Sequence, residues 1–433
     1  MIQKYRLRFM ARLKPFELWL LVFFVTLCSF ALPFMLERND ERWARTTTRI
    51  EQKGGSIIPP EPVLQLNIDQ LEWIDLAADF PHAYMNPELQ GRMARPVYPA
   101  MVSTASRLYQ GITELPGAGF SAFIGPCSPL EAYRSAVIIN WLVLMLSVFG
   151  FYHLLQRWRF NHATALLAAA HLALTMNVLF TLPVITPDLS VLGIVVAALW
   201  LFSACSRHGG REIHPLGAIV CGLLMGLLLM VKQHYDVMAT VWILLLLTKR
   251  WRTAGITFIA HFLPHACWVG ILRLMGLAYT SREVDDYGQG TWIIEEFLFL
   301  PSKHKLVTLW DFTLDYLHGL HLLYGPVILL AAAIGIIALL RKRAFDWIIV
   351  AFAGIVMNGT LTFAINLGAS SRFILSSFFI IYPLAAIGVE GLCARLGSPV
   401  RKKVLLLYLV LATAMVWIRI FHLPIFTVVW PSL

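Results

Sequence analysis

The feature that most constrains this chain is a succession of apolar stretches, each close to the length that crosses a lipid bilayer. After a first stretch at about 18–36, others follow at 133–156, 164–182, 187–204, 215–232, 234–247, 254–275, 321–340, 346–365, 373–394 and 403–423. About 20 apolar residues cross the roughly 30 Å hydrocarbon core as an α-helix. The pattern therefore predicts an all-α polytopic membrane protein with about 11 transmembrane helices.

The composition agrees with a chain that dissolves in lipid. It is 58% hydrophobic and 14% charged, whereas a soluble domain is about half apolar and a quarter charged. The net charge of +10 does not indicate nucleic-acid binding, because the basic residues are spread over short loops instead of forming a stripe. Five of the six cysteines lie in or beside apolar stretches, so neither a disulfide framework nor a thiolate metal site is predicted.

The basic residues indicate which way the chain is threaded. A basic flank from Lys4 to Lys14 precedes the first span, and every second loop is also basic. These loops contain Arg157/Arg159, Arg207/Arg211, Lys249/Arg250/Arg252, Arg341/Lys342/Arg343 and Arg395/Arg401/Lys402/Lys403. Basic loops stay in the cytoplasm, so we expect the N-terminus inside and the C-terminus outside. A cleaved signal peptide is the alternative for 18–36, but no small-residue cleavage site follows it.

Residues 1–433 are expected to form a single transmembrane domain with two large extracytoplasmic loops, 37–130 and 276–320. In the first loop, apolar residues recur near helical spacing at 63–83 and at 94–109. Neither segment is long or apolar enough to span. We expect both to be amphipathic helices lying on the outer membrane surface.

The first loop also holds the best candidate for catalysis. Asp79 is followed by Tyr84 and then by Arg95 before Pro96. An acid beside a membrane surface can take a proton from an attacking hydroxyl, and an arginine fork suits phosphate or carboxylate oxygens. The alternative for Asp79 is a capping or solvated acid, and Glu72 and Asp75 are nearby competitors for the role of base. The alternative for Arg92 and Arg95 is contact with lipid head groups.

Two further groups of candidates fall at predicted outer turns. Lys232, His234 and Asp236 mark a tight turn between two short spans, and Arg372 stands before the span at 373–394. Charges at the edge of spans are costly and tend to have functional partners. Lys232 and Arg372 are therefore candidates for phosphate binding, and His234 or Asp236 for orienting a substrate. A snorkelling Lys232 and an Arg372 paired with an outer acid are the structural alternatives.

No cofactor is firmly predicted, although a divalent cation is possible at Asp285 and Asp286, since oxygen ligands suit magnesium or manganese. The alternative is an acidic pair in a solvated loop. His261 and His265 share a helix face, but no Glu follows the first His, so the zinc-protease pattern fails. We expect these histidines to be buried polar residues that link helices.

Several short motifs together resemble the GT-C superfamily of integral-membrane glycosyltransferases, in particular its dolichyl-phosphate-mannose mannosyltransferases. They are Asp79 with Tyr84, Arg95-Pro96-Val97-Tyr98-Pro99, Thr186-Pro187-Asp188-Leu189, Gly222 to Leu227 with Lys232, and Arg372-Phe373-Ile374-Leu375 with Pro383. The chain departs from many members in having Asp79 well downstream of the acids after the first span, Glu37, Asp40 and Glu41. Either acid group could thus supply the base.

The resemblance implies an enzyme that moves a sugar from a polyprenyl-phosphate donor to a glycan, lipid or protein acceptor at the outer membrane face. Asp79 would be the base, Lys232 and Arg372 would face the lipid phosphate, and Asp188 would belong to the substrate site. A bacterial inner membrane is the preferred setting, and an endoplasmic reticulum membrane is the other. The alternatives for function are an O-antigen ligase or polymerase, a transporter or flippase of lipid-linked substrates, and a structural subunit.

Overall fold

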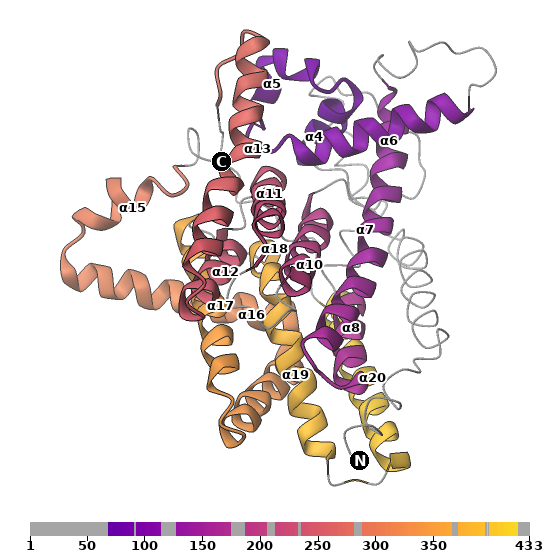
Figure 1. Ribbon diagram of the computed structural model, residues 1–433, viewed down its shortest axis with the longest axis vertical. Helices are drawn as coiled ribbons and strands as arrows, with labels where there is room; N and C mark the ends of the chain where they lie inside the picture. Colours follow the sequence, from indigo (N-terminus) through magenta and orange to yellow (C-terminus); the bar gives the residue numbers. More distant parts are fainter. Residues whose placement is uncertain are drawn as a thin grey trace.

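The computed structural model describes residues 68–90, 92–113, 127–174, 187–205, 213–232, 235–280, 288–365, 371–394, 396 and 398–422. All regular structure in these ranges is helical, with helices stacked along the long axis of the molecule (Figure 1). The predicted span at 18–36, His234 and the Asp285–Asp286 pair lie outside the described residues.

Each predicted span from 133–156 onward corresponds to a described helix. The helices are α7 (Pro129–Arg157), α8 (His162–Leu174), α10 (Asp188–Cys205), α11 (Pro215–Val231), α12 (Tyr235–Leu247), α13 (Trp251–Leu274), α16 (Ser302–Arg341), α17 (Phe345–Ala364), α19 (Phe378–Cys393) and α20 (Ser398–His422). In the described part, five stretches are long and apolar enough to cross a membrane, and shorter apolar helices accompany them. They lie in α7, α13, α16, α17 and in η4 (Leu375–Ser377) together with α19. The chain is an integral membrane protein, and the count of 11 spans stays a prediction.

Three of the basic turns share one backbone arrangement. Arg159, Lys249 and Arg343 have positive φ angles of 67°, 57° and 53°, and each stands two residues after the end of a helix, α7, α12 or α16. In each turn the next amide reaches back to a carbonyl five residues earlier, as Phe160 does to Leu155 at 3.0 Å. Glycine usually occupies this helix-ending position. Here a basic residue occupies it and places positive charge at the turn between two consecutive helices.

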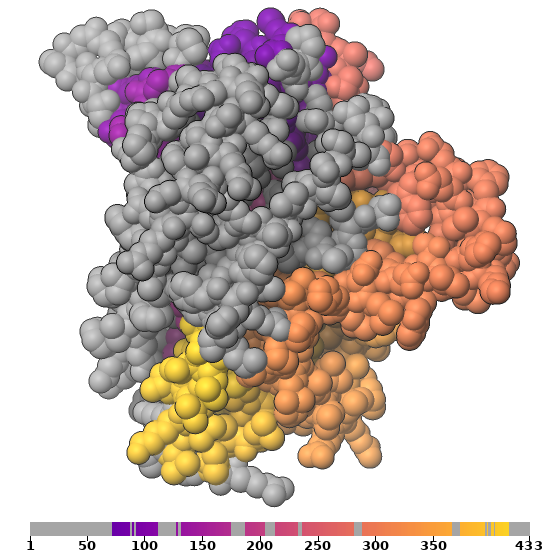
Figure 2. Space-filling view, turned by 180° about the vertical axis from the view of Figure 1, so that it is seen from behind, coloured from indigo at the N-terminus to yellow at the C-terminus, as the bar shows by residue number. Residues whose placement is uncertain are grey.

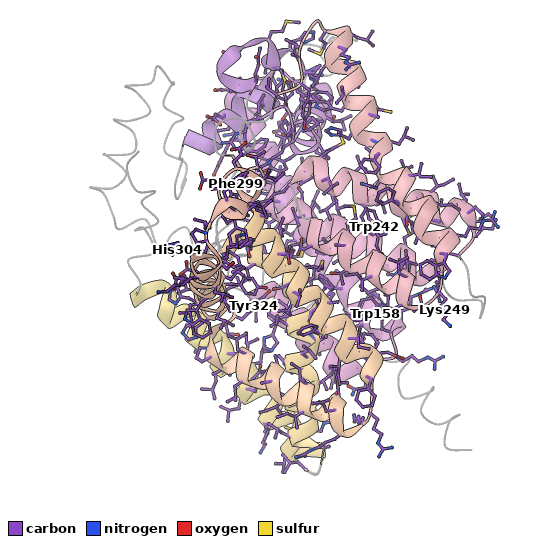
Figure 3. The ribbon with its side chains drawn as sticks, turned by 90° about the vertical axis from the view of Figure 1, so that its left-hand side faces the viewer. Trp158, Trp242, Lys249, Phe299, His304 and Tyr324 are labelled. Atoms are coloured by element: carbon purple, nitrogen blue, oxygen red, sulfur yellow. The ribbon has the colours of Figure 1, made fainter. Side chains whose placement is uncertain are left out.

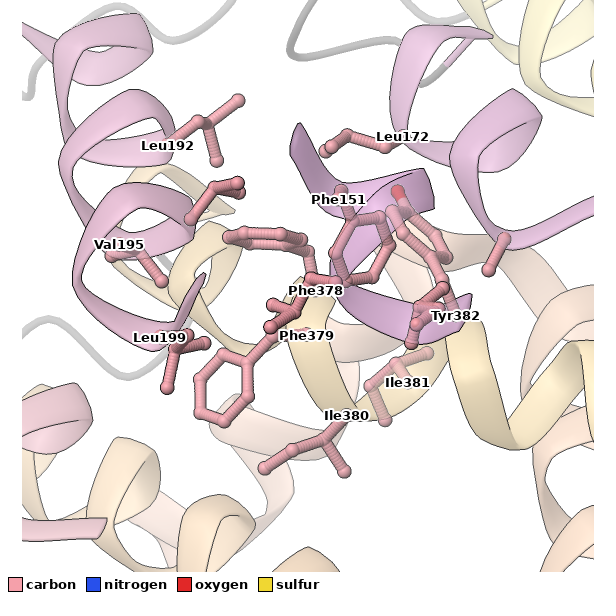
Figure 4. Packing of buried hydrophobic residues seen from close by; sticks show 14 of the residues in the cluster. Phe151, Leu172, Leu192, Val195, Leu199, Phe378, Phe379, Ile380, Ile381 and Tyr382 are labelled. Atoms are coloured by element: carbon pink, nitrogen blue, oxygen red, sulfur yellow. The ribbon is translucent and has the colours of Figure 1, made fainter. Parts of the chain in front are cut away.

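The core of the spanning part is centred on α19. The Phe378 ring meets the Phe151 ring of α7 edge to face, with centroids 5.3 Å apart, and Figure 4 shows side chains of α10 on its other side. Helix α19 also lies against α16 almost backbone to backbone. A Cβ on Gly388 would come within 2.0 Å of the Ala331 carbonyl oxygen. Small residues at such a contact allow membrane helices to approach closely.

A cap of short helices lies at one end of the molecule, above the spans in Figure 1. It consists of α4 (Ile68–Ala78), η1 (His82–Met85), α5 (Pro87–Gln90) and α6 (Val97–Thr113), and α13 extends up beside it. Each of the two segments predicted to be helical in the first loop thus contains a helix, α4 or α6, and their place on the outer membrane surface stays a prediction. The cap has its own buried cluster, which includes Trp73, Tyr84 and Tyr98 together with Trp268 of α13 and Met230 of α11. It is therefore packed on the ends of two spans.

A second projection leaves the side of the molecule, as Figures 1 and 2 show. It contains α15 (Trp292–Glu295), η3 (Phe297–Phe299) and the first half of α16, and we call residues 292–324 the arm. Helix α16 breaks at Gly325, whose φ of 73° and ψ of 162° are not helical. Residues 302–320, expected in the loop between two spans, are helical. The predicted span at 321–340 corresponds to the second half of α16.

Candidate functional site

Asp79 lies at a corner that several backbone contacts hold in place. Helix α4 ends at Ala78, and the carbonyl oxygen of Asp79 accepts a 2.8 Å hydrogen bond from the Ala83 amide in η1. Arg107 of α6 donates to the Phe80 carbonyl at 2.8 Å, and the Cys127 amide donates to the Ala78 carbonyl at 2.8 Å. The Asp79 side chain is half-buried at this corner. Its position is therefore set by α6 and by the start of α7 as well as by α4.

An aromatic group packs directly beside Asp79. The Phe80 ring stacks on Trp268 of α13 with centroids 5.9 Å apart, and Tyr84 meets Trp268 edge to face at 5.6 Å. The Trp268 indole N–H donates a 2.7 Å hydrogen bond to the Met93 carbonyl. Trp268 thus links α13 to Phe80, next to Asp79, and to Met93 further along the cap. Nothing in the sequence singles out Trp268, because tryptophans near the end of a span are common interface anchors.

Tyr84 is fully buried, and its hydroxyl has no hydrogen-bond partner among the described residues. Burial raises the pKa of this phenol well above its ordinary value, so the hydroxyl stays protonated. A buried polar group without a partner costs free energy. The Tyr84 hydroxyl is thus an unused donor among the described residues, enclosed by the protein.

The two arginines of the segment differ. Arg92 is paired with Glu72, with 2.8 Å between Nε and Oε2, and its guanidinium lies 5.4 Å from the centroid of the Trp73 ring. The expectation that Arg92 contacts lipid head groups is wrong, and Glu72, a competitor of Asp79, is already engaged. Arg95 is buried just before α6. Its burial distinguishes it from a surface arginine.

Lys232 and Asp188 form an ion pair inside the molecule, and each side chain is 1% exposed. Lys232 caps the C-terminal end of α11, and Asp188 stands in the first turn of α10, where the helix dipole favours a negative charge. The Lys232 ammonium also lies 4.3 Å from the centroid of the Phe373 ring. The alternative of a snorkelling Lys232 is therefore wrong, because this side chain does not reach solvent. Both charges are paired as buried charges must be.

Tyr98 connects the cap with α7. Its hydroxyl donates a 3.3 Å hydrogen bond to Asn140 of α7. Burial raises the pKa of Tyr98 well above its ordinary value, against the hydrogen bond to Asn140, which lowers it, and the negative charge of Asp188 also raises it. Tyr98 belongs to the same buried cluster as Tyr84 and as Met230, two residues before Lys232. The structure thus brings the Asp79 segment and the Lys232 pair to the same end of the spans.

A second polar cluster lies next to the pair and was not predicted as a unit. Asp236 Oδ2 accepts hydrogen bonds from Asn358 Nδ2 at 2.9 Å and from Ser376 Oγ at 2.5 Å. Asn358 also donates to the Phe373 carbonyl at 3.1 Å and accepts from Tyr316 at 2.8 Å. The only sequence signal was polar residues within apolar stretches. Phe373 therefore contacts Lys232 through its ring and this cluster through its backbone.

The remaining candidates are placed only in part. Arg372 belongs to α18 (Ser371–Ile374), and its side chain is not described. His261 is buried with its ring near Trp242, at 5.0 Å between centroids, and His265 lies 5.1 Å from the Tyr279 ring. In the described part of the chain, no group of three or more His, Cys, Asp or Glu residues is arranged to hold a metal ion.

The sequence matches no protein-family model, and no curated protein matches it. The structure is similar to that of the Archaeoglobus fulgidus oligosaccharyltransferase in the apo form, with a TM-score of 0.50 at 13% identity. The two chains thus share a similar fold. The match covers 93% of this chain and 56% of the oligosaccharyltransferase. The same enzyme tethered with an acceptor peptide containing the NVT sequon gives a TM-score of 0.49 at 12% identity, over 93% and 55% of the two chains.

This likeness concerns the fold alone, because the identity is low and the chain spans little more than half the length of that enzyme. The GT-C superfamily, which the motifs at Asp79, Arg95 and Lys232 resemble, and its mannosyltransferase subtype stay predictions.

Proposed function

We propose that the chain is an inverting glycosyltransferase that moves a sugar from a polyprenyl-phosphate donor to a glycan, lipid or protein acceptor. One observation carries this proposal. The corner bearing Asp79 packs through Tyr84 and Trp268 on the same end of the spans that holds the buried Lys232–Asp188 pair. A carboxylate and a cation thus lie at one end of a membrane bundle, where a lipid phosphate enters from the bilayer.

The chemistry assigns a role to each group. Asp79 takes the proton from the acceptor hydroxyl as it attacks the anomeric carbon. The phosphate leaves with the electron pair of the glycosidic bond, and Lys232 and Arg372 stabilise its negative charge. Because the hydroxyl attacks opposite the leaving phosphate, the anomeric configuration inverts.

The other predicted residues shape the substrate site. The buried Tyr84 hydroxyl donates to a substrate oxygen, and Arg95 and His234 orient the donor or acceptor. Asp188 keeps Lys232 charged and in place through their ion pair. The proposed setting is a bacterial inner membrane, with the N-terminus in the cytoplasm and the cap on the periplasmic side.

The test is transfer of labelled sugar from a panel of polyprenyl-phosphate donors by the purified protein, with Asp79→Asn beside it. The matched control is Asp75→Asn, an exposed acid four residues earlier. We expect transfer with inversion by the wild type and by the control, and its loss in Asp79→Asn at unchanged melting temperature.

Each other outcome has a definite meaning. Retained configuration in the product would contradict the inverting mechanism, and transfer by Asp79→Asn would move the base to another acid. Transfer of a whole glycan would favour a ligase or polymerase. Movement of lipid-linked sugar across liposomes without a new covalent bond would favour a flippase.

A further inference from the structure

The helical part of the arm has three distinct faces. Leu306, Trp310, Leu314 and Leu317 follow one another at spacings of 4, 4 and 3 residues, and all are exposed. His304, Asp311, Asp315 and His318 form an exposed polar stripe on a neighbouring face. Side chains three and four residues apart share one face of a helix. The arm therefore presents an apolar stripe and a polar stripe side by side.

The third face is the one that holds the arm to the rest of the molecule. Tyr316 and Leu320 are 7% and 6% exposed, whereas Leu306 is 70% and Trp310 63% exposed. Phe363 at the end of α17 packs against Trp292, Phe297 and Phe312 of the arm, with centroids 4.9, 5.2 and 4.9 Å apart. Trp292 Nε1 also donates to the Ala364 carbonyl at 2.9 Å. The exposed apolar stripe is thus separate from the side chains that fasten the arm.

The point of attachment gives the depth of the arm in the membrane. Helix α17 begins at Phe345, just after the basic turn at Arg343, and ends at Ala364 beside the arm. Its 20 residues rise about 30 Å, which is the thickness of the hydrocarbon core. Figure 3 agrees, with Lys249 and Trp158 at two basic turns on one side and Phe299 and His304 of the arm on the other. The arm therefore lies at the interface opposite the basic turns.

Gly325 makes this position possible. Its φ of 73° and ψ of 162° break α16, and Pro326 follows it, so the arm leaves the spanning half sideways, as Figure 1 shows. Residues other than glycine adopt such a conformation only with strain. The second half of α16 crosses the membrane while the first half does not continue along the same axis.

We propose that the arm is an interfacial element whose stripe of Leu306, Trp310, Leu314 and Leu317 is inserted into the lipid at the head-group boundary, with His304, Asp311 and His318 in water. We assign lipid as the partner of the apolar stripe for three reasons. The stripe continues from a membrane-spanning helix, it lies one hydrocarbon thickness from the basic turns, and a polar stripe runs along its side. A helix with these properties lies in the plane of the interface. The inference does not depend on the proposed enzymatic function.

Spin labels along the arm test this assignment directly. The six native cysteines are first replaced, and single cysteines are then introduced to carry nitroxides in liposomes. The first set of positions is 306, 310 and 317, and the second set is 304, 311 and 318. We expect oxygen to relax the first set and a water-soluble nickel complex to relax the second, with a period near 3.6 residues. Equal access of nickel to both sets would overturn the proposal. Immobile labels at 306, 310 and 317 that neither reagent reaches would show a protein partner instead.

A second experiment keeps the native cysteines. A photoreactive benzoylphenylalanine replaces Trp310 in one sample and Asp315 in another, and adducts are identified by mass spectrometry after irradiation in liposomes. We expect lipid adducts at 310 and few or none at 315. Adducts to another protein chain at 310, or equal lipid labelling at both positions, would contradict an interfacial arm.

Discussion

Asn358 of α17 donates a 2.9 Å hydrogen bond to the Asp236 carboxylate of α12, and both side chains are buried. Asn358 also bonds to Tyr316 in the arm and to the Phe373 carbonyl. The side-chain amide of Asn358 therefore links α17 with the arm, with α12 and with Phe373, whose ring lies against the Lys232 ammonium. This places the arm and the candidate site in a single network.

We expect Asn358→Ala to lower stability by about 2 kcal/mol. A hydrogen bond between membrane helices contributes about 0.6 kcal/mol on average, and a buried group that loses its partner adds about 1–3 kcal/mol. Thr360→Ala on the exposed face of the same helix is the control and should change stability little. Thermal unfolding in detergent, followed by circular dichroism, measures both. Equal effects of the two variants would count against the network.

The Lys232–Asp188 pair allows stability to be separated from catalysis. Lys232→Met leaves a buried carboxylate without its cation, which costs about 3–5 kcal/mol. Adding Asp188→Leu removes that charge, so the double variant should regain most of the loss. It should not regain sugar transfer, because the cation for the leaving phosphate is still missing. Unfolding curves and transfer rates of the wild type, the single variant and the double variant provide the measurement. A double variant that still transfers sugar would show that Lys232 takes no part in the mechanism.

Hydropathy was sufficient to predict the long helices from 129 onward, because the length of an apolar stretch depends only on local sequence, and five of these helical stretches are long and apolar enough to span. It also predicted the tight turn between Val231 and Tyr235, and helical spacing predicted two of the cap helices, α4 and α6. The arm was missed because 302–320 mixes charged and apolar residues, and a span-length criterion reads such a stretch as a loop. Its 3–4 residue spacing was a usable signal for an interfacial helix.

Contacts between distant residues were beyond reach of the sequence. Asp188 and Lys232 were both candidates, but nothing local indicates that they pair across 44 positions. Trp268 lies in a span 188 positions after Phe80, on which it stacks. Asn358 is one polar residue among apolar neighbours, and its partners lie on three other segments. Such a site exists only after the helices pack.

Tyr84 and Tyr98 form a matched pair for testing which hydroxyl meets a ligand. Tyr84→Phe removes a hydroxyl without a partner among the described residues, so we expect unchanged or slightly higher stability and a raised KM for the donor. Tyr98→Phe removes the bond to Asn140 and should cost about 1 kcal/mol. Melting temperatures and donor titrations of both variants are needed. A Tyr84→Phe enzyme with wild-type KM would show that this hydroxyl does not contact the donor.

The contact between α16 and α19 predicts opposite effects for two glycines on one helix. A Cβ at Gly388 would lie 2.0 Å from the Ala331 carbonyl oxygen, whereas at Gly391 the nearest atom is 3.8 Å away. Gly388→Ala must push the helices apart and should cost about 1–3 kcal/mol. Gly391→Ala meets no obstacle and gains helix propensity, so it should stabilise by up to about 1 kcal/mol. The two variants differ by one methyl group at positions three residues apart, and their melting temperatures should therefore move in opposite directions. A Gly388→Ala protein as stable as the wild type would mean that α16 and α19 pack less closely than the structure places them.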